Sequence, residues 1–298
     1  MKITITGASG FVGTNLKQYL EKDHEIDCLS VRYIPEQKLS INTDVIIHLS
    51  GKAHDLKKVA DPLEYYHANF ELTRQLFDAF ISSSSKIFVF MSTVKAAADQ
   101  VNGILTEEFE TNPKTHYGIA KRKAEEYILN TRLPDYKRVY ILRPCMIHGP
   151  GNKGNLNLLY NVVSKGIPWP LGNFENKRSF LNIENLCFFV GEIIDNDSVI
   201  SGIYNLADDE NLSTNELINL IGRSLKKKNL ILNINSSFIR LFAKFGDYAK
   251  LPLNTERLDK LTENYIVSNK KIKSAIKKDL PISAEIGLIK TFESFKKK

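Results

Sequence analysis

Tyr117 and Lys121 have the types and the spacing for proton transfer. The segment around them has helical spacing, and residues at i and i+4 project from one face of a helix, so the phenol and the ammonium lie within reach of each other. A free tyrosine has a pKa of about 10 and is a poor base at neutral pH. A nearby cation favours the phenolate, so we expect Lys121 to lower the pKa of Tyr117 toward working pH.

A second set of residues suits phosphate binding. Gly7, Gly10 and Gly13 follow a β-branched run at residues 3–6, and residues 15–22 have a helical pattern. Gly7 permits a tight turn, Gly10 lets the backbone approach a pyrophosphate, and Gly13 lets the helix pack against the strand. The helix N-terminus adds bare N–H groups and a positive dipole end. The pattern predicts a dinucleotide-binding turn, with an ordinary glycine turn as the alternative.

Strands and helices alternate around these residues. Strands are predicted at residues 3–6, 25–30, 43–50, 86–91 and 136–142, with Arg143-Pro144 stopping the last, and a long helix is predicted at 62–82. This alternation indicates an α/β fold with a Rossmann-type doubly wound parallel sheet. A Gly-, Pro- and Asn-rich stretch at 145–158 marks a loop that leaves the nucleotide half. Beyond it we expect strands at 178–183 and 203–206, and helices at 184–194 and 213–224, with Ser213 as a cap.

Composition places the chain among ordinary globular proteins. Its 298 residues are 43% hydrophobic and 25% charged, with a net charge of +7. The lysines are spread out and no arginine-rich stripe occurs, so we expect a basic surface that attracts an anionic substrate, and no nucleic acid. The N-terminus lacks a signal-peptide pattern, and no apolar run approaches the roughly 20 residues of a membrane span, so we expect a cytoplasmic protein without membrane insertion.

Two further features carry expectations about environment. Cys28, Cys145 and Cys187 are widely spaced, without a CxxC pair, which favours a reducing compartment and core thiols. Residues 238–248 (FIRLFAKFGDY) would suit a basic amphipathic helix on a membrane. We favour a helix of a smaller domain instead, because no other segment suggests a membrane.

The motifs together resemble one family. TGASGFVG at the start and HYGIAK around Tyr117 resemble the extended short-chain dehydrogenase/reductase family, of the NAD-dependent epimerase/dehydratase type. RPCMIHGPG resembles the family's Arg-Pro-x-x-x-Tyr-Gly-Pro-Gly, with His148 in place of the tyrosine. The resemblance covers about the first two thirds of the chain and thins toward the C-terminus. It implies a Rossmann domain at 1–152 and 179–201, and a smaller C-terminal α/β substrate domain at 153–178 and 202–298.

The resemblance also implies three catalytic residues. Thr93 would hydrogen-bond the substrate oxygen, Tyr117 would exchange a proton with it, and Lys121 would hold the tyrosine and the cofactor ribose. The positive ring of an oxidised nicotinamide would lower the pKa of Tyr117 further. Ser92 is held in reserve beside Thr93, and capping of the strand-end turn is the alternative for both hydroxyls.

Cofactor and substrate contacts follow from the same resemblance. The implied cofactor contacts are Gly7, Ser9, Gly10, Phe11, Val12, Gly13, Arg32, Leu49, Ser50, Gly51, Asn69, Tyr117, Lys121 and Pro144. The implied substrate contacts are Ser92, Thr93, Asn155, Arg178 and Arg257. Arg178 would bind the diphosphate, because a guanidinium fork suits phosphate oxygens. A surface salt bridge is the alternative for either arginine.

The second strand bears on the choice of cofactor. Asp27 lies at the count where an acidic residue accepts a hydrogen bond from the ribose 2′-OH of NAD. Compared with the family, however, the strand tip is Ser30, and Arg32 follows two residues later, so that Asp27 would lie mid-strand. An arginine there suits the 2′-phosphate of NADP. We therefore expect NADP, with NAD as the alternative, and a plain surface charge as the competing interpretation of Arg32.

Histidines give no sign of a metal site. His48, His54, His67, His116 and His148 lack metal-ligand spacing with acids or cysteines, so we expect no metal. His48 lies inside an apolar run and is interpreted as a core residue whose ring nitrogens have partners.

The softer matches suggest a branch of the family. GIPWPLGNFENKRSFLNIENL and LPLNTERLDKLTENYIV resemble enzymes that reduce 4-keto sugars of UDP-N-acetyl-6-deoxyhexosamines. Such a reductase of polysaccharide biosynthesis is our first hypothesis. A UDP-hexose 4-epimerase with bound NAD is the alternative, and a dinucleotide-binding regulatory protein is the non-enzyme alternative. A dehydratase is disfavoured, because Val94-Lys95 stands where the family's dehydratases have Asp-Glu.

The resemblance further implies a homodimer. Its interface would be formed by the helices around residues 62–82 and 115–130. We expect Phe70, Phe77 and Tyr127 to contribute exposed apolar side chains there.

Overall fold

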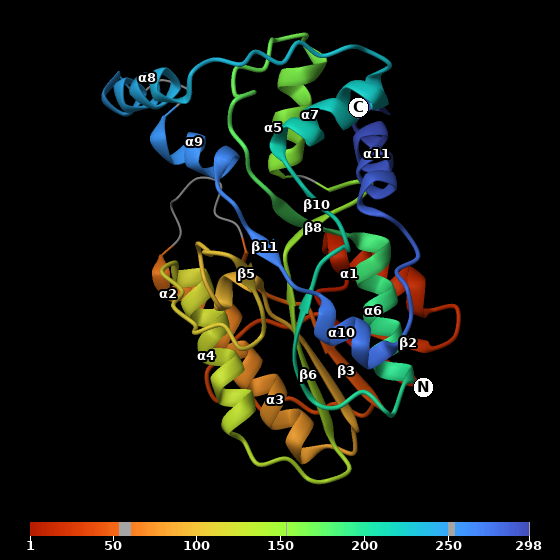
Figure 1. The fold of residues 1–298 in the computed structure, drawn as a ribbon. Coiled ribbons are helices and arrows are strands. Elements are labelled where there is room, and N and C mark those ends of the chain that lie inside the picture. The colour runs from red at the N-terminus through yellow and green to blue at the C-terminus, as the bar shows by residue number, and fades with distance from the viewer. Residues whose placement is uncertain (54–60, 153, 250–253, 298) are drawn as a thin grey trace.

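A sheet of six parallel strands forms the centre of the molecule, which the computed structural model describes for residues 1–53, 61–152, 154–249 and 254–297. The strands lie in the order β2-β1-β3-β4-β6-β9. Their bounds are Lys2–Thr6 (β1), Glu25–Leu29 (β2), Val45–His48 (β3), Ile87–Met91 (β4), Arg138–Pro144 (β6) and Gly202–Leu206 (β9). The parallel sheet, in the lower half of Figure 1, confirms the predicted fold class.

Both faces of this sheet are covered. Val45 and Ile47 belong to a core shared with α1 (Phe11–Leu20), α6 (Ile183–Asp195) and α10 (Lys270–Ile276). Ile46 and Phe88 belong to the core on the other face, shared with α3 (Leu72–Ser82) and α4 (His116–Asn130). Alternate residues of a strand point to opposite faces, so a strand buried on both sides is apolar throughout. Helices on both faces make the sheet doubly wound, as predicted (Figure 1).

The chain reverses its direction across the sheet after β2. β2 pairs with one side of β1, and β3 pairs with the other side. In such sheets the crevice at the carboxyl ends of the strands, at the point where the strand order reverses, binds ligands. Gly7 and Leu49 directly follow β1 and β3. Gly7 and Leu49, two of the predicted cofactor contacts, therefore lie at the crevice where sheets of this kind bind ligands.

The predicted helix over residues 62–82 forms in three consecutive segments. They are α2 (Pro62–Tyr66), a π-helical turn η1 (His67–Glu71) and α3. The carboxylate of Asp61 caps the start by accepting from the Leu63 N–H. π-helical turns are frequent at functional sites. Asn69, a predicted cofactor contact, lies in this turn.

A second lobe lies at the upper end in Figure 1. Its core includes Trp169, Phe180 and Ile218, and its helices are α5 (Asn155–Ser164), α7 (Thr214–Leu225) and α11 (Ala284–Ser294), with η3 (Phe295–Lys297) after them. β8 (Arg178–Asn182) pairs with β7 (Met146–His148) and β10 (Asn211–Leu212). A reciprocal capping box of Ser213 and Glu216 starts α7, which confirms the predicted cap.

Shorter elements connect the two lobes. η2 (Val94–Ala96) follows β4, and β5 (Ile104–Leu105) pairs with β11 (Ile266–Val267). α8 (Ser236–Ala249) and α9 (Thr255–Thr262) lie at the outer edge of the upper lobe in Figure 1. β9 and α10 pack with the central sheet, although the predicted boundary at residue 202 assigned them to the substrate domain. The division into two domains is otherwise still a prediction.

Several local expectations are corrected. β6 continues through Arg143 and Pro144, because a proline lacks only the N–H donor and can still pair with Leu206 of β9. Cys28 is exposed on the edge strand β2, whereas Cys145 and Cys187 are buried, as expected for core thiols. Phe77 is fully buried against the rings of neighbouring aromatic residues, because it faces the sheet, and it offers no surface to a second copy.

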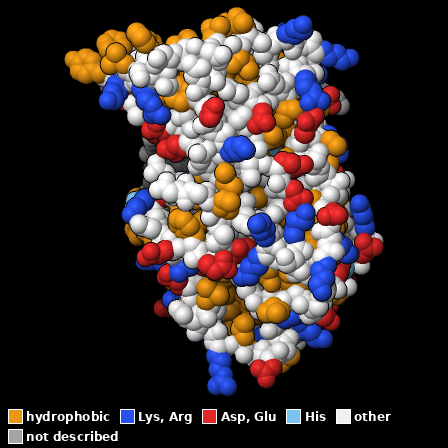
Figure 2. Space-filling model, in the orientation of Figure 1, with side chains coloured by type: hydrophobic (Ala, Val, Ile, Leu, Met, Phe, Trp, Pro, Cys, Tyr) orange, Lys and Arg blue, Asp and Glu red, His pale blue; other side chains and the backbone are white. Residues whose placement is uncertain are grey.

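α8 forms as a helix, but only a narrow face of it packs on the molecule. Ile239, Ala243 and Gly246 are its buried residues. Its exposed large apolar side chains are Phe238, Leu241, Phe242, Phe245 and Tyr248, which are between 51% and 90% exposed. Hydrophobic side chains accordingly gather at the upper left of Figure 2, over this helix. The expected packing of this helix against the smaller domain is therefore found only for the face of α8 that carries Ile239, Ala243 and Gly246.

Candidate active site

The turn after β1 has no room for side chains at two of its glycines, Gly7 and Gly13. Gly7 has φ of +71°, a left-handed conformation that glycine adopts without strain. A Cβ on Gly7 would lie 2.9 Å from the Ser50 nitrogen, and one on Gly13 would lie 2.2 Å from the Gly7 oxygen. Both separations are shorter than real Cβ contacts, so only glycine fits. The predicted roles of Gly7 in the turn and Gly13 in close packing are confirmed.

The turn leads into a helix whose first amides are free to bind an anion. Gly10 is the N-cap of α1, and among the described residues no side chain caps this helix start. Ser9 is exposed in the turn, while Phe11 and Val12 are half-buried in the first helical turn. Bare amides and a positive dipole end suit phosphate oxygens. This cradle fits the pyrophosphate of a dinucleotide.

The end of β3 forms the neighbouring wall. Leu49 and Ser50 are half-buried, and the Ser50 N–H donates to the Thr6 hydroxyl at 3.3 Å. A Cβ on the next residue, Gly51, would lie 2.5 Å from Asn69 Oδ1 and 3.4 Å from Lys121 Nζ. The lack of a side chain at Gly51 therefore brings Asn69 and Lys121 to the same place.

Hydrogen bonds fix Asn69 in the π-helical turn. Its Oδ1 accepts from the Lys52 N–H at 3.1 Å, and its Nδ2 donates to the Lys52 and Tyr65 carbonyls at 3.0 Å each. Asn69 is fully buried. Its side chain therefore clamps the chain after β3 to the helix, beside the predicted cofactor crevice.

Thr93, Tyr117 and Lys121 come together at the carboxyl end of β4. Lys121 Nζ donates to the Met91 carbonyl at 2.8 Å, two residues before Thr93. Thr93 Oγ1 accepts from the Lys95 N–H at 3.2 Å, so Thr93 also caps η2. The Tyr117 side chain interacts with that of Thr93. Thr115 caps α4 through the Gly118 N–H, and this fixes the helix that carries Tyr117 and Lys121.

Burial sets the proton affinities of this group. It raises the pKa of Tyr117 to about 12, against the opposing interaction with Thr93. It lowers the pKa of Lys121 to about 7, against the opposing charge of Glu125. We expected the pKa of Tyr117 to fall; it rises because loss of water disfavours the phenolate more than its neighbours favour it. Tyr117 is thus a phenol that can donate a proton.

His48 is confirmed as a core residue whose ring nitrogens both have partners. Nδ1 lies 2.8 Å from the Thr6 hydroxyl, and Nε2 lies 3.0 Å from that of Thr73. Burial, followed by the charge of Lys121, holds the pKa of His48 well below its ordinary value. A neutral ring between two hydroxyls thus links β3 to Thr6 of β1 and to Thr73 of α3.

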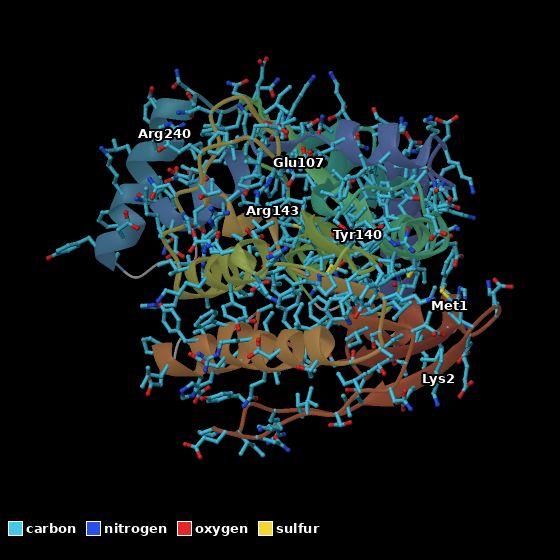
Figure 3. The ribbon with its side chains drawn as sticks, turned by 90° about the horizontal axis from the view of Figure 1, so that it is seen from below. Met1, Lys2, Glu107, Tyr140, Arg143 and Arg240 are labelled. Carbon is cyan, nitrogen blue, oxygen red and sulfur yellow. The ribbon has the colours of Figure 1, made fainter. Side chains whose placement is uncertain are left out.

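Ser92 belongs to a buried polar network. Its hydroxyl donates to Glu125 at 2.6 Å, and the same carboxylate receives two bonds from Arg143, at 2.9 Å and 2.6 Å. Glu125 and Arg143 are both buried, and Figure 3 labels Arg143 in the interior beside Tyr140. This differs from the reserve role in substrate binding that we gave Ser92, and it leaves Thr93 as the hydroxyl beside Tyr117. Pro144, directly after Arg143, is buried at the end of β6.

Two cations, Lys95 and Arg178, interact with each other near Thr93. Arg178 at the start of β8 is half-buried and donates to the Lys260 carbonyl of α9. Lys95 Nζ donates to the Asp99 carbonyl at 2.7 Å and lies 4.5 Å from the centre of the Tyr265 ring. Burial first, and then the charges of Arg178 and Lys260, lower the pKa of Lys95, while Asp99 and Glu263 oppose this. Burial likewise lowers the pKa of Arg178.

The sequence reasoning missed Lys95 as a candidate contact. Half-buried like charges cost free energy, and an anion between them would relieve that cost. The sequence did hold a signal for Lys95. It lies two residues after Thr93, at a position where the family's dehydratases have a carboxylate. It carries meaning only once Arg178, far away in the sequence, is known to lie beside it.

The remaining predicted substrate residues lie farther out. Asn155 is exposed at the first position of α5, and Arg257 is exposed on α9, one turn before Lys260. Because Arg178 bonds to the Lys260 carbonyl, α9 lies directly against Arg178. Arg257 therefore lies on α9, the helix that contacts Arg178.

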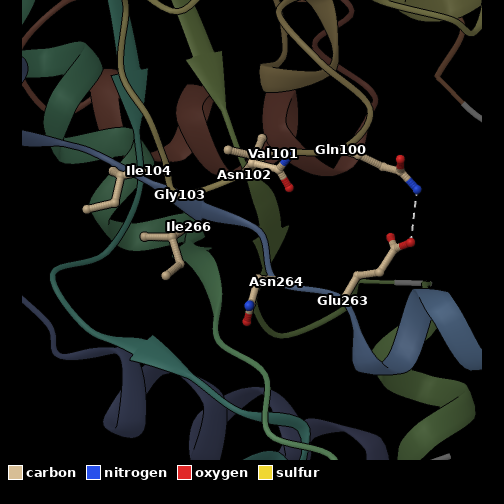
Figure 4. A pocket seen from close by; sticks show the side chains of 8 residues that line it. All are labelled: Gln100, Val101, Asn102, Gly103, Ile104, Glu263, Asn264 and Ile266. Carbon is tan, nitrogen blue, oxygen red and sulfur yellow. Dashed lines mark hydrogen bonds between the residues drawn. The ribbon is translucent and has the colours of Figure 1, made fainter.

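A cavity adjoins this cationic pair but not the catalytic residues. It measures about 390 Å³ and is lined by Gln100, Val101, Asn102, Gly103, Ile104, Glu263, Asn264 and Ile266. Figure 4 shows the hydrogen bond from Gln100 to Glu263, 2.9 Å long, at one end. Glu263, which lines the cavity, also interacts electrostatically with Lys95 and Arg178, so one wall of the cavity borders this cationic pair.

The tip of β2 agrees with the sequence prediction. β2 ends at Leu29, so Asp27 lies mid-strand, opposite Thr4 of β1. Ser30 and Arg32 follow and are exposed. Within the described ranges, Arg32 has no ion-pair partner, and its guanidinium is available to a ligand.

His148 takes the place of the motif's tyrosine and is a core residue. It is buried, with Nδ1 3.0 Å from the Thr291 hydroxyl and Nε2 3.6 Å from Asp208. Asp208 also accepts from the Asn182 N–H and the Asn185 side chain. The ring therefore ties β7 to α11 and does not face the catalytic group.

The described residues show neither a metal site nor a membrane-spanning helix. No group of three His, Cys, Asp or Glu side chains there is arranged to hold a metal ion. His54 lies outside the residues that the structure describes. None of the helices in those same ranges is long and apolar enough to cross a bilayer.

Comparisons with known proteins agree with this geometry. The model of the NAD dependent epimerase/dehydratase family matches residues 3–207. A UDP-glucose 4-epimerase of Vibrio cholerae is 29% identical over 98% of this chain and 95% of its own length. A UDP-2-acetamido-2,6-beta-L-arabino-hexul-4-ose reductase of Pseudomonas aeruginosa is 28% identical over 62% of this chain and 47% of its own length.

Solved structures show the same fold. The structure of RMD from Pseudomonas aeruginosa complexed with NADPH superposes with a TM-score of 0.74 at 19% identity, covering 99% of both chains. The similarity extends over both lobes, so the second lobe is part of the shared fold.

Proposed function

Since the chain belongs to the NAD dependent epimerase/dehydratase family, we propose that it reduces the 4-keto group of a nucleotide-linked sugar, most specifically a UDP-4-keto-6-deoxy-N-acetylhexosamine, with NADPH. The convergence of Thr93, Tyr117 and Lys121 beside the glycine cradle carries this proposal. A nicotinamide bound there supplies a hydride to C4. The residues of this chain supply the proton and the binding contacts.

Tyr117 is the proton donor in this scheme. As C4 of the keto sugar becomes tetrahedral, its oxygen gains negative charge and takes the phenolic proton. The oxygen of Tyr117 then carries the negative charge. Lys121, four residues along α4 on the same face, stabilises that charge when protonated. The Thr93 hydroxyl donates to the same substrate oxygen. One proton and one hydride convert the ketone to an alcohol, which balances the reaction.

Two observations favour the reductase. A pKa of about 12 keeps Tyr117 protonated, as a proton donor requires. The tip of β2 presents Ser30 and Arg32 and no carboxylate, which suits a cofactor with a 2′-phosphate. The substrate diphosphate would lie between Lys95 and Arg178, with Arg257 and Asn155 beside it.

A UDP-hexose 4-epimerase is the second candidate, because the Vibrio cholerae relative with that activity aligns over nearly the whole chain. An epimerase uses the same residues, with Tyr117 first as base, and keeps NAD bound between turnovers. Native mass spectrometry of the purified protein separates the two. Retained NAD would favour the epimerase, and an empty site that takes up NADPH would favour the reductase.

Arg32→Ala is expected to lower NADPH affinity about tenfold to a hundredfold and to leave NADH affinity unchanged. The guanidinium would form a charge-assisted hydrogen bond to the 2′-phosphate, worth about 1.5–3 kcal/mol. Titration of both cofactors into wild type and variant measures this. Arg132→Ala changes a second exposed arginine, in the segment after α4, and is the matched control that should change neither affinity.

An equal loss for both cofactors would assign Arg32 to structure. Tighter NADH binding by the wild type would indicate that Asp27 binds the ribose of NAD, and it would favour the epimerase. The two results can be told apart. The first compares the variant with the wild type, whereas the second compares the affinities of the wild type for NADPH and NADH.

The homodimer stays a prediction. Phe70 and Tyr127 are half-buried and meet edge to face, 6.5 Å apart, on the helices proposed for the interface. Leu63 and Leu129 add exposed side chains on α2 and α4. Phe77 is buried in the core and is no longer proposed as part of this surface.

A further inference from the structure

α8 carries an apolar face that the molecule leaves in solvent. Five large side chains, Phe238, Leu241, Phe242, Phe245 and Tyr248, are at least half exposed. Every exposed phenylalanine among the large exposed hydrophobic residues of the described chain lies on this helix. Contiguous exposed patches of this kind mark interaction surfaces, whereas single exposed side chains do not.

The face is continuous along the helix. At 100° per residue, these five side chains fall within an arc of about 120°. The buried Ile239, Ala243 and Gly246 occupy the neighbouring arc, which packs on the body of the protein. The apolar arc therefore points outward, along the length of a helix held at the edge of the upper lobe (Figure 1).

Cations border this face. Arg240 and Lys244 are exposed on the side next to Leu241 and Tyr248, and Figure 3 labels Arg240 at the periphery of the molecule. Along the segment before α8, Leu230 and Ile234 add exposed apolar area, and Lys226 to Lys228 are exposed. Figure 2 shows hydrophobic side chains along the upper edge of the molecule, with Lys and Arg side chains beneath and beside them.

The acidic groups nearby are already engaged. The Asp247 carboxylate accepts from the Thr255 N–H at 3.0 Å and from its hydroxyl at 2.5 Å. Asp247 lies about 160° around the helix from the centre of the apolar arc. Asp259 of α9 lies 3.9 Å from Arg240. Arg240 lies about 140° from that centre and stacks over the Phe174 ring at 5.4 Å, so Lys244, about 100° from the centre, is the cation that α8 presents beside its apolar arc.

We propose that α8 is an interfacial helix that docks the protein on an anionic lipid bilayer. Its aromatic and leucine side chains would enter the boundary between headgroups and acyl chains, and Lys244 would extend to the phosphates. The net charge of +7 adds attraction to an anionic surface. The 14-residue helix is about 21 Å long, too short to span the roughly 30 Å of hydrocarbon, so it lies on the membrane.

The charges argue against a second copy as the occupant. A two-fold interface places the same patch against itself. Two copies of α8 would then place Lys244 at the edge of the contact, and the apolar arc of α8 carries no carboxylate to pair with it. A bilayer with anionic headgroups complements both parts of the patch. The inference goes beyond the proposed function and does not depend on the reaction.

The test is flotation of the full chain with vesicles of phosphatidylcholine, with and without phosphatidylglycerol. We expect binding to the mixed vesicles, weakened by high salt. Phe245→Ser/Tyr248→Ser should reduce binding about tenfold or more, because two large apolar side chains no longer enter the membrane. Lys244→Gln should weaken binding only to vesicles that contain phosphatidylglycerol.

A matched control uses exposed side chains elsewhere. Tyr136 and Ile200 are 62% and 78% exposed, so Tyr136→Ser/Ile200→Ser should float like the wild type. Circular dichroism and NADPH binding verify that each variant folds, and turnover of a UDP-linked substrate without vesicles should be equal in all of them. Absence of wild-type flotation overturns the proposal. So does flotation that the α8 variants do not reduce, or sedimentation that shows α8 joining two copies in its place.

Discussion

Replacing Tyr117 by phenylalanine is expected to reduce turnover by about 10²- to 10⁴-fold, the usual contribution of a general acid. The substitution removes only the phenolic oxygen. The ring keeps its half-buried place at the start of α4, so the fold and the affinity for cofactor should stay close to wild type. Steady-state rates with a UDP-4-keto sugar and NADPH, together with cofactor titration, measure both quantities.

The same helix offers a matched control. Tyr127 lies ten residues further along α4, and its hydroxyl donates to Asp78 at 2.6 Å, away from the catalytic group. Tyr127→Phe removes the same atom and should leave turnover unchanged. Near-normal activity of Tyr117→Phe, or an equal loss in Tyr127→Phe, would show that Tyr117 is not the proton donor.

Lys121→Met is expected to weaken cofactor binding and turnover together, yet to stabilise the cofactor-free protein at neutral pH. The first effect follows from the loss of the ammonium beside Gly51 and Asn69. The second follows from burial. Burial lowers the pKa of Lys121 from 10.5 to about 7, so the folded state disfavours its charged form.

The dependence on pH has a definite sign. The unfolded chain keeps the proton on Lys121 up to its ordinary pKa of 10.5, whereas the folded chain loses it above about 7. Between these values the unfolded state binds more protons, so the free energy of unfolding of the wild type rises with pH. Relative to Lys121→Met, we expect a rise of roughly 2 kcal/mol between pH 7 and pH 9.

Urea unfolding of the cofactor-free proteins at both pH values measures this difference. Lys123→Met, at an exposed position two residues along α4, is the control and should follow the wild type at both values. A constant difference between wild type and Lys121→Met across pH 7 to 9 would mean that Lys121 is solvated in the folded protein. A loss of stability at pH 7 in Lys121→Met, with cofactor affinity kept, would make its role structural.

The features that the sequence predicted depend on local pattern. Gly7 and Gly13 are required by a turn and a helix adjacent in sequence, and the spacing of Tyr117 and Lys121 follows from the helix itself. The parallel sheet also follows from the alternation of strands and helices. These features need no knowledge of which distant segments meet.

The features that it missed depend on burial and on distant contacts. The pKa of Tyr117 rises because of the amount of protein packed around it, which no spacing reveals. The hydroxyl of Ser92 is directed to Glu125 because Arg143, from another strand, holds that carboxylate in place. The pattern of α8 predicted a helix with an apolar side, but only the structure shows that much of that side faces solvent.

The most direct test of the central claim follows a label from cofactor to product. With a UDP-4-keto-6-deoxy-N-acetylhexosamine and NADPH deuterated at the transferred position of the nicotinamide ring, we expect an alcohol product that carries one deuterium at C4, formed in step with NADPH consumption. Nuclear magnetic resonance of the product locates the label. Turnover of a UDP-hexose to its 4-epimer, with no deuterium in the product and no net consumption of NADPH, would contradict the reductase and establish the epimerase.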